Sequence, residues 1–290
     1  MTQHRSASLS AHGAAFLFGL TGIFGALIQA DSIVITCGRA GFAVAALALF
    51  AALNKLPMRL QLAQAGFLLM TGLLLAAHWV SFFIAVKVGG VALATLGFAS
   101  FPAFIALIDV LVFGERIGTP ERILLSLITL GLILVTPSFD FADQATSGLL
   151  WGIGSGLSFA LIVIANRRGA RGLDPLQVAL WQNVVVAALL LPFAIAKPPA
   201  LHPSDWIYLA LLGVLCTALA QYLFVRSLQG LSARSAGMII ALEPVYAIAC
   251  AWWLFAQQPS LRMLAGAALI ICAIIWSARS APGPAKAPAF

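Results

Sequence analysis

The chain has 290 residues, of which 62% are hydrophobic and 9% are charged, and its mean hydropathy is +1.04. Because a soluble domain is about one quarter charged, this composition excludes a soluble protein and predicts an integral membrane protein. The net charge of +7 is compatible with nucleic-acid binding, but the basic residues occupy alternate loops instead of one patch, so no nucleic-acid partner is expected.

Apolar stretches follow one another along the whole chain, each long enough to cross about 30 Å of hydrocarbon as a helix. They are residues 11–30, 32–53, 63–86, 90–113, 120–137, 147–166, 175–196, 204–225, 235–256 and 260–279. The connections between them are short, and residues 1–10 and 281–290 are predicted to be tails. The sequence therefore predicts an all-α integral membrane fold of ten transmembrane helices, with the lipid bilayer as its surroundings.

The loop charges predict an orientation. With a cytoplasmic N-terminus, the inner side collects Arg5, Lys55, Arg59, Arg116, Arg122, Arg167, Arg168, Arg171, Arg226, Arg234, Arg279 and Lys286. The outer side keeps Lys87, Lys197 and Arg262. Since basic residues concentrate on the cytoplasmic side of membrane proteins, both termini are predicted to be cytoplasmic.

The chain also resembles itself at one offset. AALALF at 45–50 resembles AALLLP at 187–192, NKLP at 54–57 resembles AKPP at 196–199, and Pro102 corresponds to Pro244. The offset is 142 residues each time (187 − 45, 196 − 54 and 244 − 102), which indicates an internal duplication with repeats at 11–140 and 141–280. Because each repeat holds an odd number of spans, the second enters the membrane from the opposite side. Inverted repeats around a central cavity are typical of secondary transporters.

A carboxylate and a proline stand together in the ninth span. Pro102 and Pro244 each remove a backbone N–H inside a span and predict a hinge or kink. An ionised group such as Glu243 costs at least about 2.5–3.5 kcal/mol at the bilayer centre, so it is expected to face the interior of the bundle. Its repeat partner is Phe101 (243 − 142), which makes the site chemically one-sided and suits a substrate with two unlike ends. An ion pair with an interior arginine is the alternative.

Further candidates for substrate contact are the polar and aromatic residues at membrane depth. They are Arg39, His78, Trp79, Phe98, Phe101, Trp181, Gln182, Asn183, Gln221, Tyr222, Glu243 and Tyr246. Together they predict an aromatic-lined cavity with few polar groups, which suits a flat organic ligand; helix packing is the alternative for each one singly. Asp109 is a candidate gate or proton site, or a helix-end acid that pairs with Arg116 or Arg122.

Small residues predict close helix contacts. Gly19, Gly22 and Gly25 mark a face of the first span, and Gly152, Gly154 and Gly156 mark a face of the sixth.

Neither metal chemistry nor catalysis is expected. The four cysteines lie inside apolar spans without metal-type spacing, and the histidines are scattered, so no metal, cofactor or catalytic residue is predicted. A membrane-embedded enzyme would need paired acids or a metal cluster, and a helper or sensor subunit is disfavoured by the lack of extramembrane domains.

Several motifs together resemble a known family. LEPVYA with Glu243 and Pro244, GER at 114–116 and Arg39 in the second span, on ten helices in two repeats, resemble the drug/metabolite transporter superfamily of EamA type. The aromatic interior is most similar to its bacterial aromatic amino-acid exporter branch. One departure is AQQ at 256–258, where family members often repeat GE, which puts in doubt a role for the outer loop equivalent to that of Glu115.

The resemblance implies a bacterial inner-membrane exporter that moves small molecules by alternating access. A monomer is compatible with the sequence, which does not fix the oligomeric state. Aromatic and other neutral amino acids are the expected substrates, with Glu243 attracting an ammonium group and Arg39 or freed backbone groups meeting a carboxylate. Export of cationic drugs through Glu243 is the alternative.

Overall fold

The computed structural model describes residues 2–60, 62–114, 116, 118, 119–136, 138, 140, 142–169, 173–196, 201–227, 239–240, 242–256 and 258–280. Within this part of the chain the elements are helical, as the sequence predicts. The predicted C-terminal tail at 281–290, the start of the predicted ninth span and Glu115 lie outside the described residues.

The first half of the chain forms five helices. They are α1 (Thr2–Leu27), α2 (Ser32–Leu53), α3 (Leu62–Phe98), α4 (Phe101–Leu111) and α5 (Thr119–Val135). Residues 2–10, predicted as a tail, are therefore helical. The element α3 consists of two helices that meet at a kink at Gly90, whose φ of 83° is readily adopted only by glycine. The kink lies at the predicted boundary between the third and fourth spans.

The second half continues with α6 (Gln144–Gly169), α7 (Pro175–Ala196), α8 (Pro203–Gly213), a π-helical turn η1 (Val214–Leu219), α9 (Ala220–Ser227), α11 (Glu243–Phe255) and α12 (Leu261–Ser280). Among the described residues, six helical stretches are long and apolar enough to cross a membrane, with α8, η1 and α9 counted as one of them, and shorter apolar helices accompany them. The molecule is thus a multi-helix membrane protein.

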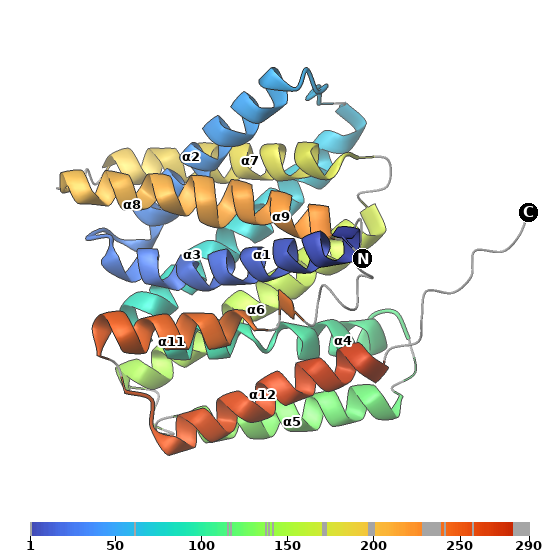
Figure 1. The fold of residues 1–290 in the computed structure, drawn as a ribbon, viewed down its shortest axis with the longest axis vertical. Coiled ribbons are helices and arrows are strands. Elements are labelled where there is room, and N and C mark those ends of the chain that lie inside the picture. Colours follow the sequence, from blue (N-terminus) through green and yellow to red (C-terminus); the bar gives the residue numbers. More distant parts are fainter. Residues whose placement is uncertain are drawn as a thin grey trace, which may run out of the picture.

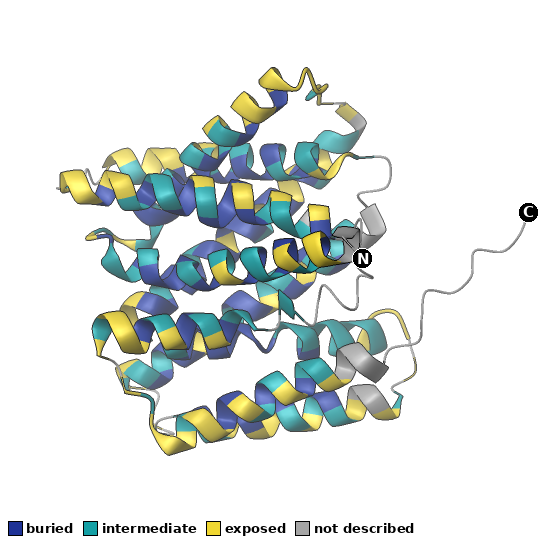
Figure 2. Cartoon of the chain, in the orientation of Figure 1, coloured by how far each residue is buried: buried dark blue, intermediate teal, exposed yellow. Residues whose placement is uncertain are grey.

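Most of the helices lie side by side with their axes roughly along one direction, whereas α2 and α3 run obliquely to the others (Figure 1). α2 packs on α7, α5 packs on α12, and α3 and α6 make the most extensive contact. α1 contacts both α9 and α11, and α4 packs against α6. Buried residues follow the inner faces, whereas large apolar side chains such as Trp253, Leu261 and Leu111 are exposed on the outside (Figure 2). An exposed apolar surface of this kind suits lipid.

Glycines allow the central helices to approach closely. A Cβ added at Gly152 in α6 would lie 2.7 Å from the Ala94 carbonyl oxygen, and one at Gly148 would lie 2.4 Å from Gly89 Cα. Gly156 similarly faces the Phe98 carbonyl. The stripe is therefore 148, 152 and 156, four residues apart, and the prediction for Gly154 was wrong: no described atom outside its own neighbourhood lies within 4 Å of its added Cβ.

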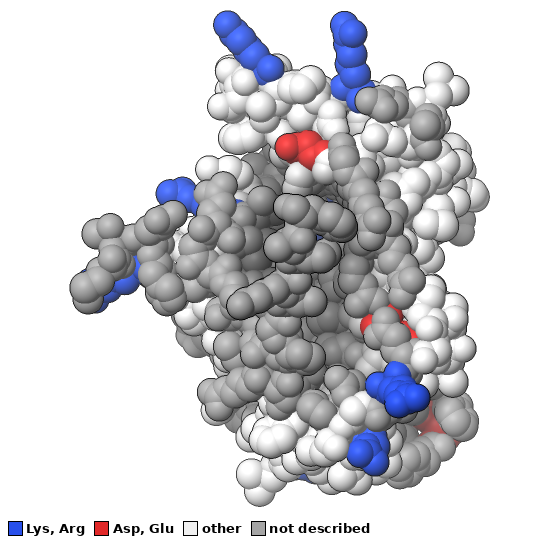
Figure 3. All heavy atoms as spheres, turned by 90° about the vertical axis from the view of Figure 1, so that its right-hand side faces the viewer, with Lys and Arg blue, Asp and Glu red and all other residues white. Residues whose placement is uncertain are grey.

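The charged residues distinguish the two ends of the bundle. Figure 3 looks onto the end at which α1 begins, and Lys and Arg side chains lie along the margins of this face. Lys55 and Arg59 follow α2 at this end, and Arg122 and Arg226 lie in α5 and α9. Asp31, Asp143 and Asp205 lie at the opposite end, where α2, α6 and α8 begin.

Candidate functional site

Arg39 is a buried cation in the middle of the bundle. The Asp31 carboxylate caps α2 by accepting from the N–H groups of Ile33 and Val34, and Arg39 follows about two turns later. Its side chain is 4% exposed. The guanidinium carbon lies 4.0 Å from the ring centroid of Trp79 in α3, a cation–π contact that partly replaces lost hydration.

The other partners of Arg39 come from the π-helical turn. Arg39 Nε donates to Thr217 Oγ1 at 2.7 Å, and Nη2 donates to the Cys216 carbonyl at a long 3.5 Å. The Thr217 hydroxyl donates in turn to the Leu212 carbonyl, five residues earlier, at 3.0 Å. π-helical turns are rare and occur frequently at functional sites, and no sequence pattern distinguishes residues 214–219 from an ordinary apolar helix.

A glycine makes this contact possible. A Cβ added at Gly213 would lie 2.6 Å from the Arg39 carbonyl oxygen and 2.5 Å from Phe42 Cβ. Because these distances are shorter than van der Waals contact, only a glycine lets α8 come this close to α2. The close approach brings the π-helical turn within hydrogen-bonding reach of the Arg39 side chain.

Among the described residues, the Arg39 charge has no direct counter-ion. No carboxylate of the described residues lies within ion-pair distance of the guanidinium, although Glu243 is close enough to act on it electrostatically. A buried charge without a partner costs on the order of several kcal/mol. The alternative of a direct Arg39–Glu243 ion pair is therefore not what this conformation shows.

Glu243 is the first residue of α11, and Pro244 is the second. Its side chain is partly buried and makes no hydrogen bond with the described residues. α1 packs tightly here, since a Cβ added at Gly19 would lie 3.1 Å from the Glu243 carbonyl and 3.0 Å from Tyr246 Cβ. Tyr246 itself is within 3.3 Å of His12 Nδ1 through its hydroxyl.

Both prolines stand at helix starts. α4 begins at Phe101 and α11 at Glu243, so the two helices start 142 residues apart (243 − 101) and each has its proline in the second position. α3 ends at Phe98, and Ala99 and Ser100 form a turn before α4. The fourth span is thus interrupted instead of merely bent. Asp109 lies near the far end of α4.

Aromatic rings gather where α3, α4 and α6 meet. Phe98 stacks on Phe101 with ring centroids 5.2 Å apart, and Phe159 lies 5.1 Å from Phe101 and 5.3 Å from Phe98. His78 joins them at 5.2 Å from Phe98. The predicted residues His78, Phe98 and Phe101 are therefore together, and Phe159, which the sequence analysis missed, completes the group.

Ser155 fixes the His78 ring. The Ser155 hydroxyl donates to the His78 carbonyl at 3.0 Å and lies 2.7 Å from His78 Nδ1. Since the single hydroxyl proton is already used, Nδ1 is the donor in the second contact. The ring nitrogen Nε2 is then left as an acceptor beside the phenylalanines.

The polar residues of α7 divide between two environments. Trp181 Nε1 donates to the Met58 carbonyl at 3.1 Å, so this ring is tied to the α2–α3 connection. Gln182 donates to Asn166 Oδ1 at 3.3 Å. Asn183 is fully buried and donates to the Ala179 carbonyl, but its Oδ1 has no partner among the described residues.

Gln221 and Tyr222 face different ways. Gln221 Oε1 is buried and, within the described part of the chain, without a hydrogen-bond donor. Tyr222 is 43% exposed and packs against Phe50 at a centroid distance of 5.6 Å. Gln221, four residues after Thr217, lies on the side of this span that carries Thr217, whereas Tyr222 is turned toward α2.

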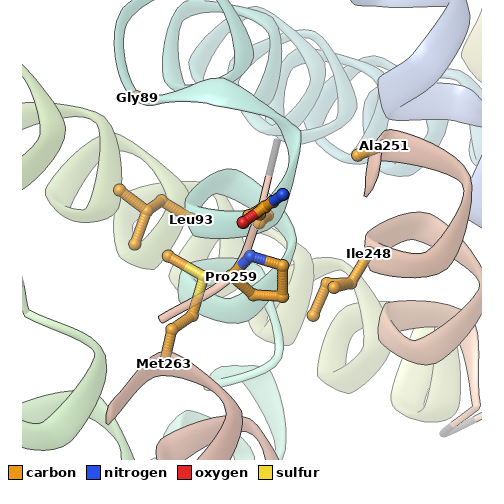
Figure 4. A pocket seen from close by; sticks show the side chains of 8 residues that line it. Gly89, Leu93, Ile248, Ala251, Pro259 and Met263 are labelled. Atoms are coloured by element: carbon orange, nitrogen blue, oxygen red, sulfur yellow. The ribbon is translucent and has the colours of Figure 1, made fainter. Parts of the chain in front are cut away.

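A small cavity lies away from these residues. Its volume is about 80 Å³, and it is lined by Gly89, Leu93, Ile248, Ala251, Pro259 and Met263, among others (Figure 4). Ligand pockets for organic molecules have volumes of about 300–1,000 Å³, so this cavity is too small for such a ligand. We place the candidate site at Arg39 and the aromatic group instead, because these residues supply a buried charge and aromatic rings that can bind a solute.

Metal binding finds no support in the described residues, which contain no group of three or more His, Cys, Asp or Glu side chains placed to hold an ion.

The comparisons with known proteins agree with this architecture. The model of the EamA-like transporter family matches residues 5–136 and again residues 146–279. The chain belongs to the EamA-like transporter family. It is 25% identical over 195 residues to an uncharacterized transporter of Archaeoglobus fulgidus, a match that covers 67% of this chain and 70% of that protein.

Two further relatives are similar. An uncharacterized transporter of Bacillus subtilis, YxxF, is 23% identical over 203 residues, which is 69% of this chain and 65% of that protein. One solved crystal structure superposes with a TM-score of 0.67 at 20% identity and covers 94% of this chain and 96% of its own. At that identity the likeness supports the fold alone.

Proposed function

We propose that this membrane transporter exports small amphipathic metabolites, chiefly aromatic and other neutral amino acids, across the inner membrane by alternating access. The observation that carries the proposal is the buried Arg39 guanidinium on Trp79, near a carboxylate at Glu243. One cation and one anion in a partly aromatic interior match a zwitterion with an aromatic side chain.

The two halves support alternating access. α4 and α11 start at equivalent positions after helix breaks, α4 packs on α6 as α11 packs on α1, and the family model matches each half once. We infer ten membrane crossings in two inverted repeats, in which α3 and α4 provide the third and fourth crossings. Such repeats can exchange conformations and open one site to alternate sides.

Contacts at the end opposite the N-terminus fit a closed outer gate. The Asp205 carboxylate, 1% exposed, accepts from the Gln29 N–H at 3.0 Å and so joins α8 to the α1–α2 connection. Lys87 Nζ donates to the Ile28 carbonyl at the end of α1. With the face of Figure 3, which carries Lys and Arg along its margins beside a few acidic side chains, in the cytoplasm, as the distribution of Lys and Arg favours, these contacts lie on the outer side.

A cationic-drug exporter is the second candidate. It is favoured by one observation: within the described residues the Glu243 carboxylate makes no hydrogen bond or ion pair, and a transported cation would supply one. In that case Arg39 would have no role in recognition.

The test is uptake into proteoliposomes that hold the purified protein. Radiolabelled phenylalanine and tryptophan should enter saturably, unlabelled threonine should compete as another neutral amino acid, and a cationic drug should compete weakly. Because a hydrogen bond to a charged group contributes about 1.5–3 kcal/mol, Glu243→Gln should lower kcat/KM for phenylalanine about 10-fold or more. Asp140→Asn, at an exposed acid, is the matched control and should leave transport unchanged.

Two results would contradict the proposal. Drug transport without amino-acid flux would replace the proposal with the cationic-drug exporter, and full phenylalanine transport by a well-folded Glu243→Gln protein would remove Glu243 from the site.

A further inference from the structure

The donors of Arg39 are only partly used. Nε bonds to Thr217 Oγ1 and Nη2 reaches the Cys216 carbonyl, and no bond of Nη1 to the described residues is found. The guanidinium face is covered by Trp79 at 4.0 Å. Within the described residues, the two N–H groups of Nη1 and the second N–H group of Nη2 have no hydrogen-bond partner. Nη1 and Nη2 form the edge that matches a carboxylate in the paired geometry.

A second observation lies on the same span. Gln221 Oε1 is a buried acceptor without a donor in the described part of the chain. It belongs to α9, one helical turn beyond Thr217 and about 6 Å along the axis. Unpaired donors of Arg39 and an unpaired acceptor of Gln221 are what a ligand carrying both an anion and an N–H donor would satisfy.

We propose that Arg39 binds the carboxylate of the transported solute and that Thr217 is the residue that positions Arg39 for it. This inference rests on the proposed function and narrows its substrate class to solutes with a free carboxylate next to an ammonium group, whose N–H groups face Gln221. The π-helical turn supports the arrangement because it turns the Thr217 hydroxyl toward Arg39, while Trp79 prevents the guanidinium from tilting away.

The geometry assigns Thr217 the role of positioning Arg39, because Thr217 does not compete with the solute carboxylate for the same N–H groups. Its hydroxyl takes the Nε edge of Arg39 and donates its own proton to the Leu212 carbonyl, so it does not occupy the Nη1–Nη2 edge. Loss of the hydroxyl therefore releases the guanidinium without adding or removing a contact to the solute.

The experiment compares phenylalanine with phenethylamine, which has the same ring and amine but no carboxylate. In proteoliposomes, Thr217→Val should raise KM for phenylalanine about 10-fold, as expected for loss of one hydrogen bond to a charged group. Its kcat should stay within about twofold, and uptake of phenethylamine should not change. Thr217→Ser, which keeps the hydroxyl, should restore the wild-type KM for phenylalanine.

Two further variants separate positioning from packing. Thr71→Val removes another fully buried threonine hydroxyl, which donates to the Phe67 carbonyl at 2.9 Å and touches no charge, and it should leave the ratio of the two KM values unchanged. Arg39→Lys, which cannot pair with a carboxylate through two parallel bonds, should raise KM for phenylalanine selectively.

Equal KM changes for both solutes in Thr217→Val, or an unchanged KM for phenylalanine, would overturn the inference and leave the proposed export of amino acids standing. A wild-type protein that transports phenethylamine but no phenylalanine would overturn both.

Discussion

The crossing of α3 and α6 makes a sharp prediction about two glycines in the same helix. Gly152 and Gly154 both lie within α6, and both would gain helix propensity of about 0.5–1 kcal/mol on replacement by alanine. Only Gly152 faces α3, where an added Cβ would lie 2.7 Å from the Ala94 carbonyl and 3.2 Å from Gly97 Cα. Both neighbours are backbone atoms and cannot rotate away.

The two substitutions are expected to change the stability of the protein in opposite directions. Overpacking of this kind costs about 1–3 kcal/mol, which exceeds the gain in propensity, so Gly152→Ala should be destabilising. Gly154→Ala meets no described atom within 4 Å and should be neutral or stabilising. The expected difference between the two variants is about 2 kcal/mol.

Thermal unfolding of the purified protein in detergent measures this difference. The Tm of Gly152→Ala should fall below that of the wild type, and the Tm of Gly154→Ala should equal or exceed it. Equal shifts for both variants would mean that α3 and α6 do not approach through residues 148, 152 and 156, and the packing described here would be refuted.

Two further predictions concern the end opposite the N-terminus. Asp205→Ala removes the acceptor of the Gln29 and His202 N–H groups and should lower stability by about 1–3 kcal/mol, measured as a lower Tm; an unchanged Tm would contradict a structural role. Hydrogen bonds from the backbone N–H and then the hydroxyl of Thr146 hold the pKa of Asp143 below its usual range. The stabilisation is therefore present above the ordinary pKa of an aspartate and is lost as the pH falls through the lowered value, so Tm should drop more on acidification in the wild type than in Asp143→Asn; parallel curves would refute this.

Much of the fold was predictable because membrane helices are defined by composition and length. The apolar stretches, the offset between Pro102 and Pro244 and the carboxylate beside the second proline all stand in the sequence. The helix starts at Phe101 and Glu243 agree with that offset, since the first turn of a helix accepts proline without loss of a hydrogen bond.

The rest depends on contacts between distant segments. The kink at Gly90 and the facing glycines at 89 and 148 require knowledge of which helices cross. Alternate glycines at 152, 154 and 156 looked like one small face, but a helix places 148, 152 and 156 together. Ser155 and Phe159, which orient His78 and complete the aromatic group, have no local pattern that distinguishes them from ordinary helix residues.

The π-helical turn also governs which side chains of its span face inward. Such a turn contains one residue more than an α-helical turn, and one residue corresponds to about 100° of rotation. Everything after Leu219 is therefore rotated relative to an uninterrupted helix, and in this rotated arrangement Tyr222 packs against Phe50. Deletion of a single residue from this turn would rotate the side chains of α9 by about 100° with little change in the composition of the span, so its length is as much a part of the site as its side chains.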